Sequence, residues 1–187
     1  GNYQEPIDKD TVATIDINNL KPTDWYTLAK LYAEAKHGSL PNLSIVNVRV
    51  FNYFSHTQDM NARFLITDIL RAIKNKEIFK TSADNIVRDF ITPPDFYNLV
   101  QAIIDFKHTN IALDCYTKSP VLKFDLLSKL EDKFALKYTV DPLADIINST
   151  GIKANYYSTN AIAGDIGYVP KFTSLEGIVQ EFYLLDL

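Results

Sequence analysis

The sequence predicts an α/β fold built around a parallel sheet, and two observations support this prediction. Segments in which apolar residues recur at helical spacing alternate along the chain with short runs rich in β-branched residues. One run, residues 43–51 (LSIVNVRVF), is apolar enough for a strand buried on both faces, as strands inside a parallel sheet are. The 187 residues, 47% of them hydrophobic, amount to one ordinary domain or to pieces of two.

The elements are predicted in the following order. Residues 1–23 contain prolines and an Asn-Asn pair, which predict a surface loop. A helix begins at Thr23 or Asp24, where a capping residue precedes helically spaced apolar residues, and it ends at His37-Gly38. After the strand at 43–51, the spacing predicts helices at about 61–74, 93–106, 123–134, 155–166 and 174–185, and strands at about 77–80, 86–91, 111–116 and 137–140.

The composition excludes several classes of protein. The formal net charge of -4 is spread along the chain and forms no basic stripe, so we expect no nucleic-acid partner. No apolar run approaches the roughly 18 residues that cross a bilayer, and the N-terminus is unlike a signal peptide. We therefore expect a cytoplasmic protein without membrane contact. Cys115, the single cysteine, suits a reducing cytosol and is interpreted as a small buried hydrophobe.

The sharpest chemical feature is the pair Tyr26 and Lys30, four residues apart near the start of the first helix. Residues at this spacing lie on one helix face, which holds a phenol and an ammonium together. A neighbouring cation stabilises a phenolate, and such a pair can move protons near neutral pH. The spacing alone is weak, because both residue types are common on helices, and an exposed structural pair is the alternative.

This helix is the first of five motifs along the chain. They are residues 26–34 (YTLAKLYAE), 48–53 (VRVFNY), 86–95 (IVRDFITPPD), 166–170 (IGYVP) and 174–178 (SLEGI). They resemble, in turn, the Tyr-x-x-x-Lys helix, the Arg-x-x-Asn-x-Tyr strand, the Arg-Asp-aromatic stretch and the closing signature of extended short-chain dehydrogenases/reductases. The resemblance is to the NAD-dependent epimerases and dehydratases of nucleotide sugars, and it covers nearly the whole chain.

The resemblance implies the C-terminal part of a Rossmann-like doubly wound parallel sheet plus a small α/β substrate-binding domain. Residues 1–52 would be a remnant of the Rossmann-like domain, and residues 53–187 mainly the substrate-binding domain, with 94–116 returning to the Rossmann-like sheet. The N-terminal dinucleotide-binding βαβ units, with their glycine-rich turn, are expected to be absent from this chain. We expect NAD or NADP in the complete protein and none bound by this chain alone.

The resemblance also implies roles for individual residues. Tyr26 would be the catalytic base that takes a sugar hydroxyl proton during hydride transfer, and Lys30 would hold the nicotinamide ribose. The resemblance implies that Tyr26 and Lys30 both contact the cofactor. Asn52 would contact the cofactor edge or the substrate phosphates, with an ordinary turn former as its alternative. Arg88 would hold the diphosphate of a nucleotide-sugar substrate through charge-assisted hydrogen bonds.

Several charged residues have structural interpretations instead. Arg88 can form a surface ion pair with Asp84 or Asp89, which stays open beside the ligand role. We expect Arg49 to snorkel or to pair within the fold rather than to touch a ligand, and Asp95 to cap the helix at its position. The three histidines, His37, His56 and His108, share no ligand spacing, so we expect no metal site.

Some positions depart from the family pattern. Residues 54–56 (FSH) replace the Gly-Pro that usually follows the Asn-x-Tyr motif, which puts the sugar specificity and the activity in question. Three functions therefore stay open: a fragment of an NAD(P)-dependent nucleotide-sugar epimerase or dehydratase, a non-catalytic relative that binds a nucleotide sugar or dinucleotide, and a stand-alone interaction module. We also expect a homo-oligomer, because the strand at 45–51 would have open ladder edges.

Overall fold

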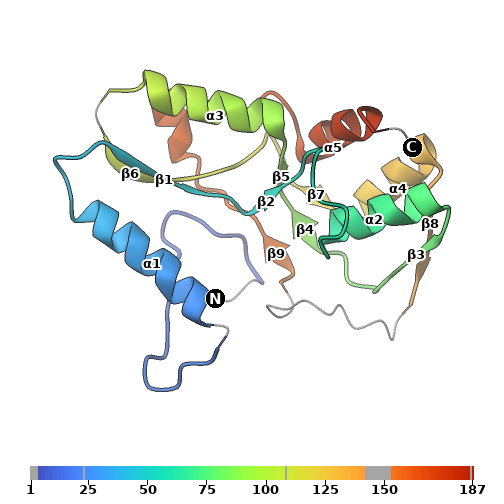
Figure 1. The fold of residues 1–187 in the computed structure, drawn as a ribbon, viewed down its shortest axis with the longest axis horizontal. Coiled ribbons are helices and arrows are strands. Elements are labelled where there is room, and N and C mark those ends of the chain that lie inside the picture. Colours follow the sequence, from blue (N-terminus) through green and yellow to red (C-terminus); the bar gives the residue numbers. More distant parts are fainter. Residues whose placement is uncertain (1–3, 23, 108, 142–152, 186) are drawn as a thin grey trace.

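The computed structural model of the chain describes residues 4–22, 24–107, 109–141, 153–185 and 187. Figure 1 shows its helices in two groups, with short strands between them. In chain order the elements are α1 (Asp24–Gly38), β1 (Ile45–Arg49), β2 (Asn52–Tyr53), α2 (Leu65–Asn75), β3 (Ile78–Thr81), β4 (Val87–Arg88), β5 (Phe90–Ile91), α3 (Pro93–Asp105), β6 (Asn110–Asp114), β7 (Val121–Leu122), α4 (Lys123–Phe134), β8 (Lys137–Val140), β9 (Asn155–Tyr156), the 3-10 helix η1 (Ile162–Ile166) and α5 (Ser174–Tyr183).

Most strand pairs are parallel, as the predicted α/β fold requires. β1 pairs with β6 in a register that runs from Ile45 opposite Asn110 to Arg49 opposite Asp114. β2 pairs with β5, and β3 with β8, also in parallel. β4 lies between β7, which is antiparallel to it, and β9, which is parallel to it. The parallel register brings Arg49 and Asp114 to the same edge of the β1–β6 sheet.

A smaller core packs α3 and η1 against β1 and β6. Cys115 lies in this core, where burial raises the pKa of its thiol to about 12, so the prediction of a small buried hydrophobe is confirmed. Val46 and Val48 of β1 pack on the same core from one face of the strand. The buried members are Ile91, Leu99, Leu113, Cys115, Ala163, Ile166 and Tyr168.

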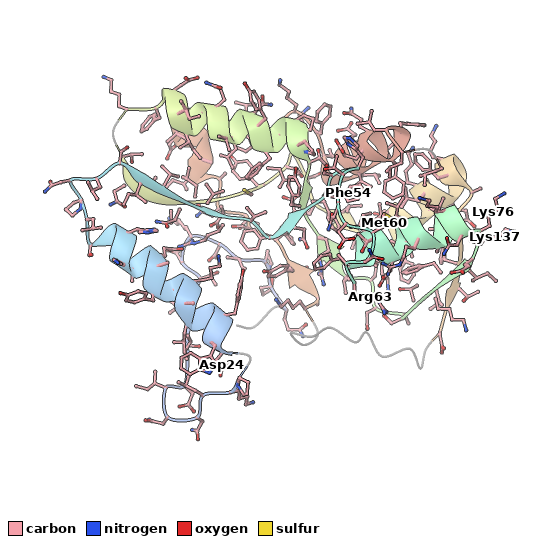
Figure 2. All side chains as sticks on the ribbon, viewed as in Figure 1. Asp24, Phe54, Met60, Arg63, Lys76 and Lys137 are labelled. Atoms are coloured by element: carbon pink, nitrogen blue, oxygen red, sulfur yellow. The ribbon has the colours of Figure 1, made fainter. Side chains whose placement is uncertain are left out.

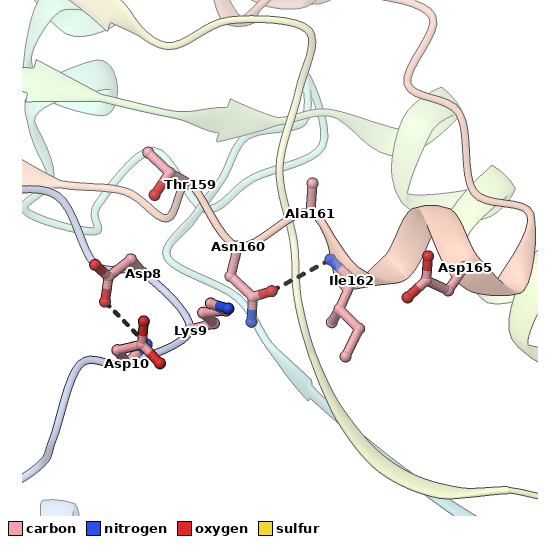
Figure 3. A pocket seen from close by; sticks show the side chains of 8 residues that line it. All are labelled: Asp8, Lys9, Asp10, Thr159, Asn160, Ala161, Ile162 and Asp165. Atoms are coloured by element: carbon pink, nitrogen blue, oxygen red, sulfur yellow. Dashed lines mark hydrogen bonds between the residues drawn. The ribbon is translucent and has the colours of Figure 1, made fainter.

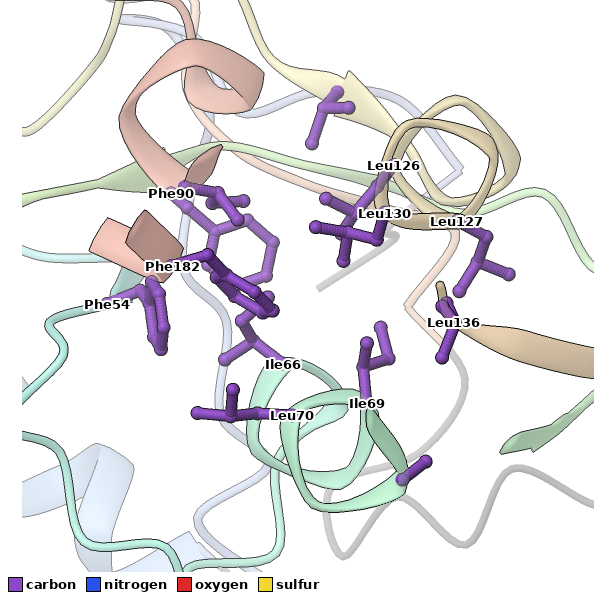
Figure 4. Packing of buried hydrophobic residues seen from close by; sticks show 13 residues of the cluster. Phe54, Ile66, Ile69, Leu70, Phe90, Leu126, Leu127, Leu130, Leu136 and Phe182 are labelled. Carbon is purple, nitrogen blue, oxygen red and sulfur yellow. The ribbon is translucent and has the colours of Figure 1, made fainter. Parts of the chain in front are cut away.

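A larger core packs α2, α4 and α5 against one another (Figure 4). Phe54, which follows β2, enters this core and packs on Phe182 of α5 with ring centroids 5.5 Å apart. Figure 2 marks Phe54 there and Asp24 at the distant start of α1. The buried members are Phe54, Ile66, Ile69, Leu70, Ala72, Phe90, Val121, Leu126, Leu127, Leu130, Leu136, Ile178 and Phe182.

The first helix attaches to the sheet through polar contacts rather than through a buried apolar face. No residue of α1 is buried. His37 Nδ1 lies 2.6 Å from Asn47 Oδ1, and Asn110 Nδ2 donates to the carbonyl of His37 at 2.7 Å. The prediction that β1 is buried on both faces is therefore wrong: Val46 and Val48 face a core, while Asn47 and Arg49 present polar groups to α1.

The helix predicted at 155–166 is also wrong. Asn155 and Tyr156 form β9 against β4, and the next residues run beside the N-terminal loop, where the Ile7 N–H donates to the Tyr157 carbonyl at 2.9 Å. Only Ile162–Ile166 is helical, as a 3-10 turn. The apolar spacing in this segment resembles a helix, but pairing with distant strands overrides that local pattern.

Asp95 does not cap α3, contrary to prediction. The residue at the cap position is Thr92, whose side chain makes no capping hydrogen bond. Asp95 is 1% exposed, and its carboxylate accepts the backbone N–H groups of Lys171 (2.8 Å) and Phe172 (3.0 Å). It thereby ties α3 to the segment that leads into α5.

Candidate active site

Tyr26 and Lys30 lie together on the outer surface of α1. The Lys30 Nζ is 5.4 Å from the centre of the Tyr26 ring, a distance typical of a cation–π contact. Tyr26 is 72% exposed and Lys30 is also exposed. A phenol and an ammonium are therefore presented side by side and within reach of a ligand. Thr23, one of the two candidates for the cap of this helix, lies outside the described residues.

Arg49 at the end of β1 joins the C-terminal half of α1 to the β1–β6 sheet. Its guanidinium forms a two-point ion pair with Glu34 of α1 and a further bond of 3.2 Å to the buried Asp114 of β6. The hydrogen bond from Arg49 lowers the pKa of the Glu34 carboxyl, and the same bond raises the pKa of Arg49. Asp114 also accepts a hydrogen bond of 2.6 Å from the Ser158 hydroxyl. The prediction that Arg49 pairs within the fold is confirmed.

Asn52 begins β2, and its side chain joins this strand to β9 and to the residue between β4 and β5. Its half-buried Nδ2 donates to the carbonyl of Tyr156 in β9 (3.1 Å) and to that of Asp89 between β4 and β5 (3.3 Å). The turn-former alternative is wrong, because Asn52 lies in a paired strand. Among the described residues nothing donates to its Oδ1, which leaves that oxygen for a ligand.

Arg88 forms no ion pair with the described residues, so neither Asp84 nor Asp89 neutralises it. Its Nη1 donates to its neighbour's carbonyl at Val87 (2.7 Å) and to that of Ala154 (3.3 Å). Asp89 instead accepts the Thr117 backbone N–H at 2.9 Å, and burial raises the pKa of its carboxyl. Burial also lowers the pKa of the Arg88 guanidinium. The end of β4 thus carries a half-buried positive charge.

These contacts meet at β9 and define what we call the β9 cluster: Phe51, Asn52, Arg88, Lys153 and Tyr156. Tyr156 is the register partner of Arg88. The Lys153 Nζ lies 4.1 Å from the centre of the Tyr156 ring, and the Phe51 ring meets the same ring edge-on at 5.5 Å. All five residues are half-buried. The structure therefore brings Asn52 and Arg88, two of the predicted site residues, to one place.

Lys153 and Tyr156 are the members of this cluster that sequence reasoning missed. Both lie in or beside the segment mistaken for a helix, so neither was placed near Arg88. The available signal was the β-strand composition around Tyr156, two consecutive tyrosines after an asparagine. That signal spans too few residues to compete with the helical spacing of the whole segment.

The β9 cluster and the Tyr26–Lys30 pair belong to different elements. Within the described part of the chain, no hydrogen bond or ion pair joins Tyr26 or Lys30 to Asn52 or Arg88. In the view of Figure 1, α1 and β9 lie on the same side of β1 and β2. The predicted site residues thus form two groups, one on α1 and one around β9.

Residues 54–56, where the sequence departs from the family pattern, turn away into the larger core. Phe54 is fully buried, and the His56 N–H donates to the Glu181 carboxylate at 2.8 Å. The His56 Nδ1 lies 2.7 Å from the same oxygen. This loop therefore anchors to α5. His108 lies outside the described residues.

A hollow of about 680 Å³ lies beside the N-terminal loop; Figure 3 shows the side chains that line it. Its acidic side chains disfavour an anionic ligand, and it contains none of the predicted site residues. No group of three or more His, Cys, Asp or Glu in the described ranges is placed to hold a metal ion. The lining residues are Asp8, Lys9, Asp10, Thr159, Asn160, Ala161, Ile162 and Asp165.

Comparison with known proteins gives matches among solved structures. Neither a protein-family model nor a curated protein matches the sequence. The UDP-glucuronic acid 4-epimerase from Bacillus cereus, solved in complex with NAD, superimposes with a TM-score of 0.70 at 14% identity, over 97% of this chain and 57% of that one. MoeE5 in complex with UDP-glucuronic acid and NAD gives 0.71 at 17% identity, over 96% and 59%.

The UDP-glucose 4-epimerase from Thermotoga maritima, solved with UDP-glucose, gives 0.64 at 15% identity, over 84% of this chain and 52% of that one. The chain has the fold of the C-terminal portion of a nucleotide-sugar epimerase. The predicted fold class is thereby confirmed. The chain spans less than two thirds of the length of these epimerase-fold structures. No helix among the described residues is long and apolar enough to span a membrane.

Proposed function

We propose that this chain supplies the Tyr-Lys pair and the nucleotide-sugar contacts of an NAD(P)-dependent nucleotide-sugar epimerase or dehydratase. The carrying observation is the exposed Lys30 ammonium 5.4 Å above the Tyr26 ring, on a chain with an epimerase fold. In this proposal the Tyr26 phenol takes the proton of a sugar hydroxyl. Lys30 places positive charge beside the phenol, where negative charge develops in that step.

The described residues fit one end of the implied cofactor. An exposed phenol and ammonium side by side suit the hydroxyls of a nicotinamide ribose. No glycine-rich turn joins a parallel strand to a helix among the described elements, so the pyrophosphate would be held by polypeptide other than these residues. When bound, NAD(P) would supply the hydride acceptor for the carbon that carries the sugar hydroxyl.

The β9 cluster supplies the nucleotide side of the proposed site. Arg88 retains N–H groups beyond Nη1 for charge-assisted bonds to a diphosphate, because no described carboxylate neutralises it. Asn52 offers its Oδ1 to the substrate or to the cofactor edge, while its Nδ2 holds β9 in place. UDP-glucuronic acid and UDP-glucose are the ligands of the similar structures, which supports a UDP-sugar as the substrate class.

The test is the variant Tyr26→Phe in the complete protein, with Tyr32→Phe as its matched control. Tyr32 lies on the same helix and is similarly exposed, at 68% against 72%. We expect Tyr26→Phe to lower the rate of sugar oxidation by about 100-fold or more, because the proton acceptor is lost. Calorimetry should show unchanged nucleotide-sugar binding in both variants. Full turnover by Tyr26→Phe would remove Tyr26 from the mechanism.

An interaction module is the second candidate function, and one observation favours it. Trp25 and Tyr32 on α1 are both 68% exposed, and β1 pairs with β6 alone among the described strands. An open strand edge beside exposed aromatic rings favours association with a second polypeptide or a second copy. Measuring the mass in solution tests self-association, and a monomer at high concentration would argue against it.

A further inference from the structure

The strand pair of β3 and β8 has one face on the larger core and the other face toward solvent. Phe79 and Tyr138 are opposite each other in the register and pack against the larger core. Their neighbours on both strands point the other way, because side chains alternate along a strand. We call this exposed set the β3–β8 outer face; its members are Ile78, Lys80, Lys137 and Thr139.

Positive charge gathers on this face and beside it. Lys80 and Lys137 lie on the face itself, and Lys74 and Lys76 lie at the end of α2, which leads into β3. Figure 2 labels Lys76 and Lys137 at the same end of the molecule. None of these four lysines forms an ion pair with a described carboxylate. This end is therefore basic, although the chain as a whole has a net charge of -4.

The simpler interpretation of these lysines is structural. A lysine near a helix C-terminus offsets the partial negative charge there, which fits Lys74, and lysines on exposed strands discourage pairing with other chains. Neither role accounts for Ile78, which is 55% exposed and lies opposite Lys137 and two residues before Lys80. A segment bound across the face would cover this apolar side chain, and its burial is favourable.

We infer that the β3–β8 outer face binds an acidic, extended segment of a partner protein, whose carboxylates pair with Lys80 and Lys137. The register sets the spacing of the two lysines, because Lys137 is opposite Ile78 and not opposite Lys80. With about 4.8 Å between strands and about 3.3 Å per residue, their Cα atoms are about 8 Å apart. Alternate residues of an extended segment point the same way and are about 7 Å apart. An acidic residue at every second position therefore matches the lysine pair.

This inference is independent of the proposed function, because the outer face contains no residue of the Tyr26–Lys30 pair or of the β9 cluster. The experiment measures binding of a fluorescently labelled peptide, in which glutamate and threonine alternate, to the chain by fluorescence anisotropy. One variant combines Lys80→Gln with Lys137→Gln. The matched control combines Lys36→Gln on α1 with Lys107→Gln after α3, two exposed lysines whose loss changes the net charge equally.

We expect the outer-face variant to weaken peptide binding about 5- to 10-fold and the control variant to change it by less than about 2-fold, since only the former loses two ion pairs with the peptide. Ile78→Thr should weaken binding about 3-fold through its smaller apolar contact. Raising the ionic strength from about 0.01 M to about 1 M should weaken binding by the unmodified chain, because salt screens exposed charges. Circular dichroism verifies that each variant is folded.

Four results would overturn the inference and leave the proposed function standing. The first is failure of the unmodified chain to bind the peptide at millimolar concentration. The second is an equal loss in the two lysine variants, or unchanged binding in Ile78→Thr, because the peptide would then sense net charge alone. The third is equally tight binding of a peptide of the same composition with its glutamates in one block. The fourth is binding to phosphatidylserine vesicles in place of the peptide, which would make the face a membrane contact.

Discussion

Replacing Asp95 by alanine tests the tie between α3 and the segment before α5. The buried carboxylate accepts two backbone N–H groups, from Lys171 at 2.8 Å and from Phe172 at 3.0 Å. A hydrogen bond to a charged group contributes about 1.5–3 kcal/mol to stability, so two of them contribute about 3–6 kcal/mol. These values are already net of desolvation, so we expect Asp95→Ala to lower the free energy of unfolding by about 3–6 kcal/mol.

The assay is urea unfolding followed by far-ultraviolet circular dichroism, with hydrogen exchange as a local readout. In Asp95→Ala the amide protons of Lys171 and Phe172 should exchange faster than those of α4. Asp95→Asn should lose about half as much free energy of unfolding, because the amide has one acceptor oxygen in place of two. The exposed Asp132 on α4 is the control site, and Asp132→Ala should change stability by less than about 0.5 kcal/mol.

Two results would refute this reasoning. A loss below about 1 kcal/mol in Asp95→Ala would mean that the two hydrogen bonds contribute no more than ordinary surface contacts. Unchanged exchange at Lys171 and Phe172 would mean that their N–H groups are protected without the carboxylate. Either result would return Asp95 to the role of a local helix residue.

Three further predictions follow from other contacts. Gly177→Ala should destabilise the fold by about 1–3 kcal/mol, because the new methyl would lie 2.8 Å from the Thr92 Oγ1, and adding Thr92→Ala should recover most of the thermal midpoint. Arg49 lowers the pKa of Glu34, so the Glu34–Arg49 pair stabilises the fold above about pH 4.5, and this stabilisation is lost as the pH falls through the folded-state pKa. In Arg49→Met, the denaturant midpoint should therefore change less with pH in this acidic range. The chain alone should bind NAD(H) no better than about millimolar in calorimetry, because no glycine-rich turn lies among the described residues, and micromolar affinity would contradict the cofactor argument.

The sequence is sufficient for elements whose pattern is local and long. The helix predicted at 123–134 and the strand predicted at 137–140 agree with α4 and β8 at both ends. For α4 the reason is that apolar residues at helical spacing over this length fit no other regular structure. Residues 86–91, predicted as one strand, form β4 and β5 instead. Asp89 between them turns its side chain to Thr117, and the two halves pair with different strands. Such partners are distant in sequence, and periodicity contains no information about them.

In the candidate site, too, the residues within local motifs were predicted and those placed by distant strand pairing were not. Asn52 and Arg88 were found because each belongs to a motif with a recognisable neighbourhood. Lys153 has no such motif, and only the pairing of β9 with β4 brings it to Arg88. Asp95 was misassigned for a related reason. Its position after two prolines favours a cap, whereas the N–H groups that donate to its carboxylate are more than seventy residues away.

Within the described part of the chain, only the C-terminal half of α1 is bonded to the β1–β6 sheet, whereas the Tyr26–Lys30 pair lies in the N-terminal half. Glu34 and His37, in the C-terminal half of the helix, are bonded to the β1–β6 sheet. The N-terminal half, with Tyr26 and Lys30, has no such bond among the described residues and presents exposed Trp25 to solvent. The position of the pair relative to the β9 cluster therefore depends on what packs against that exposed surface. A partner that covers Trp25 would fix the phenol against the nucleotide contacts, so binding of that partner and turnover should rise together in the complete protein.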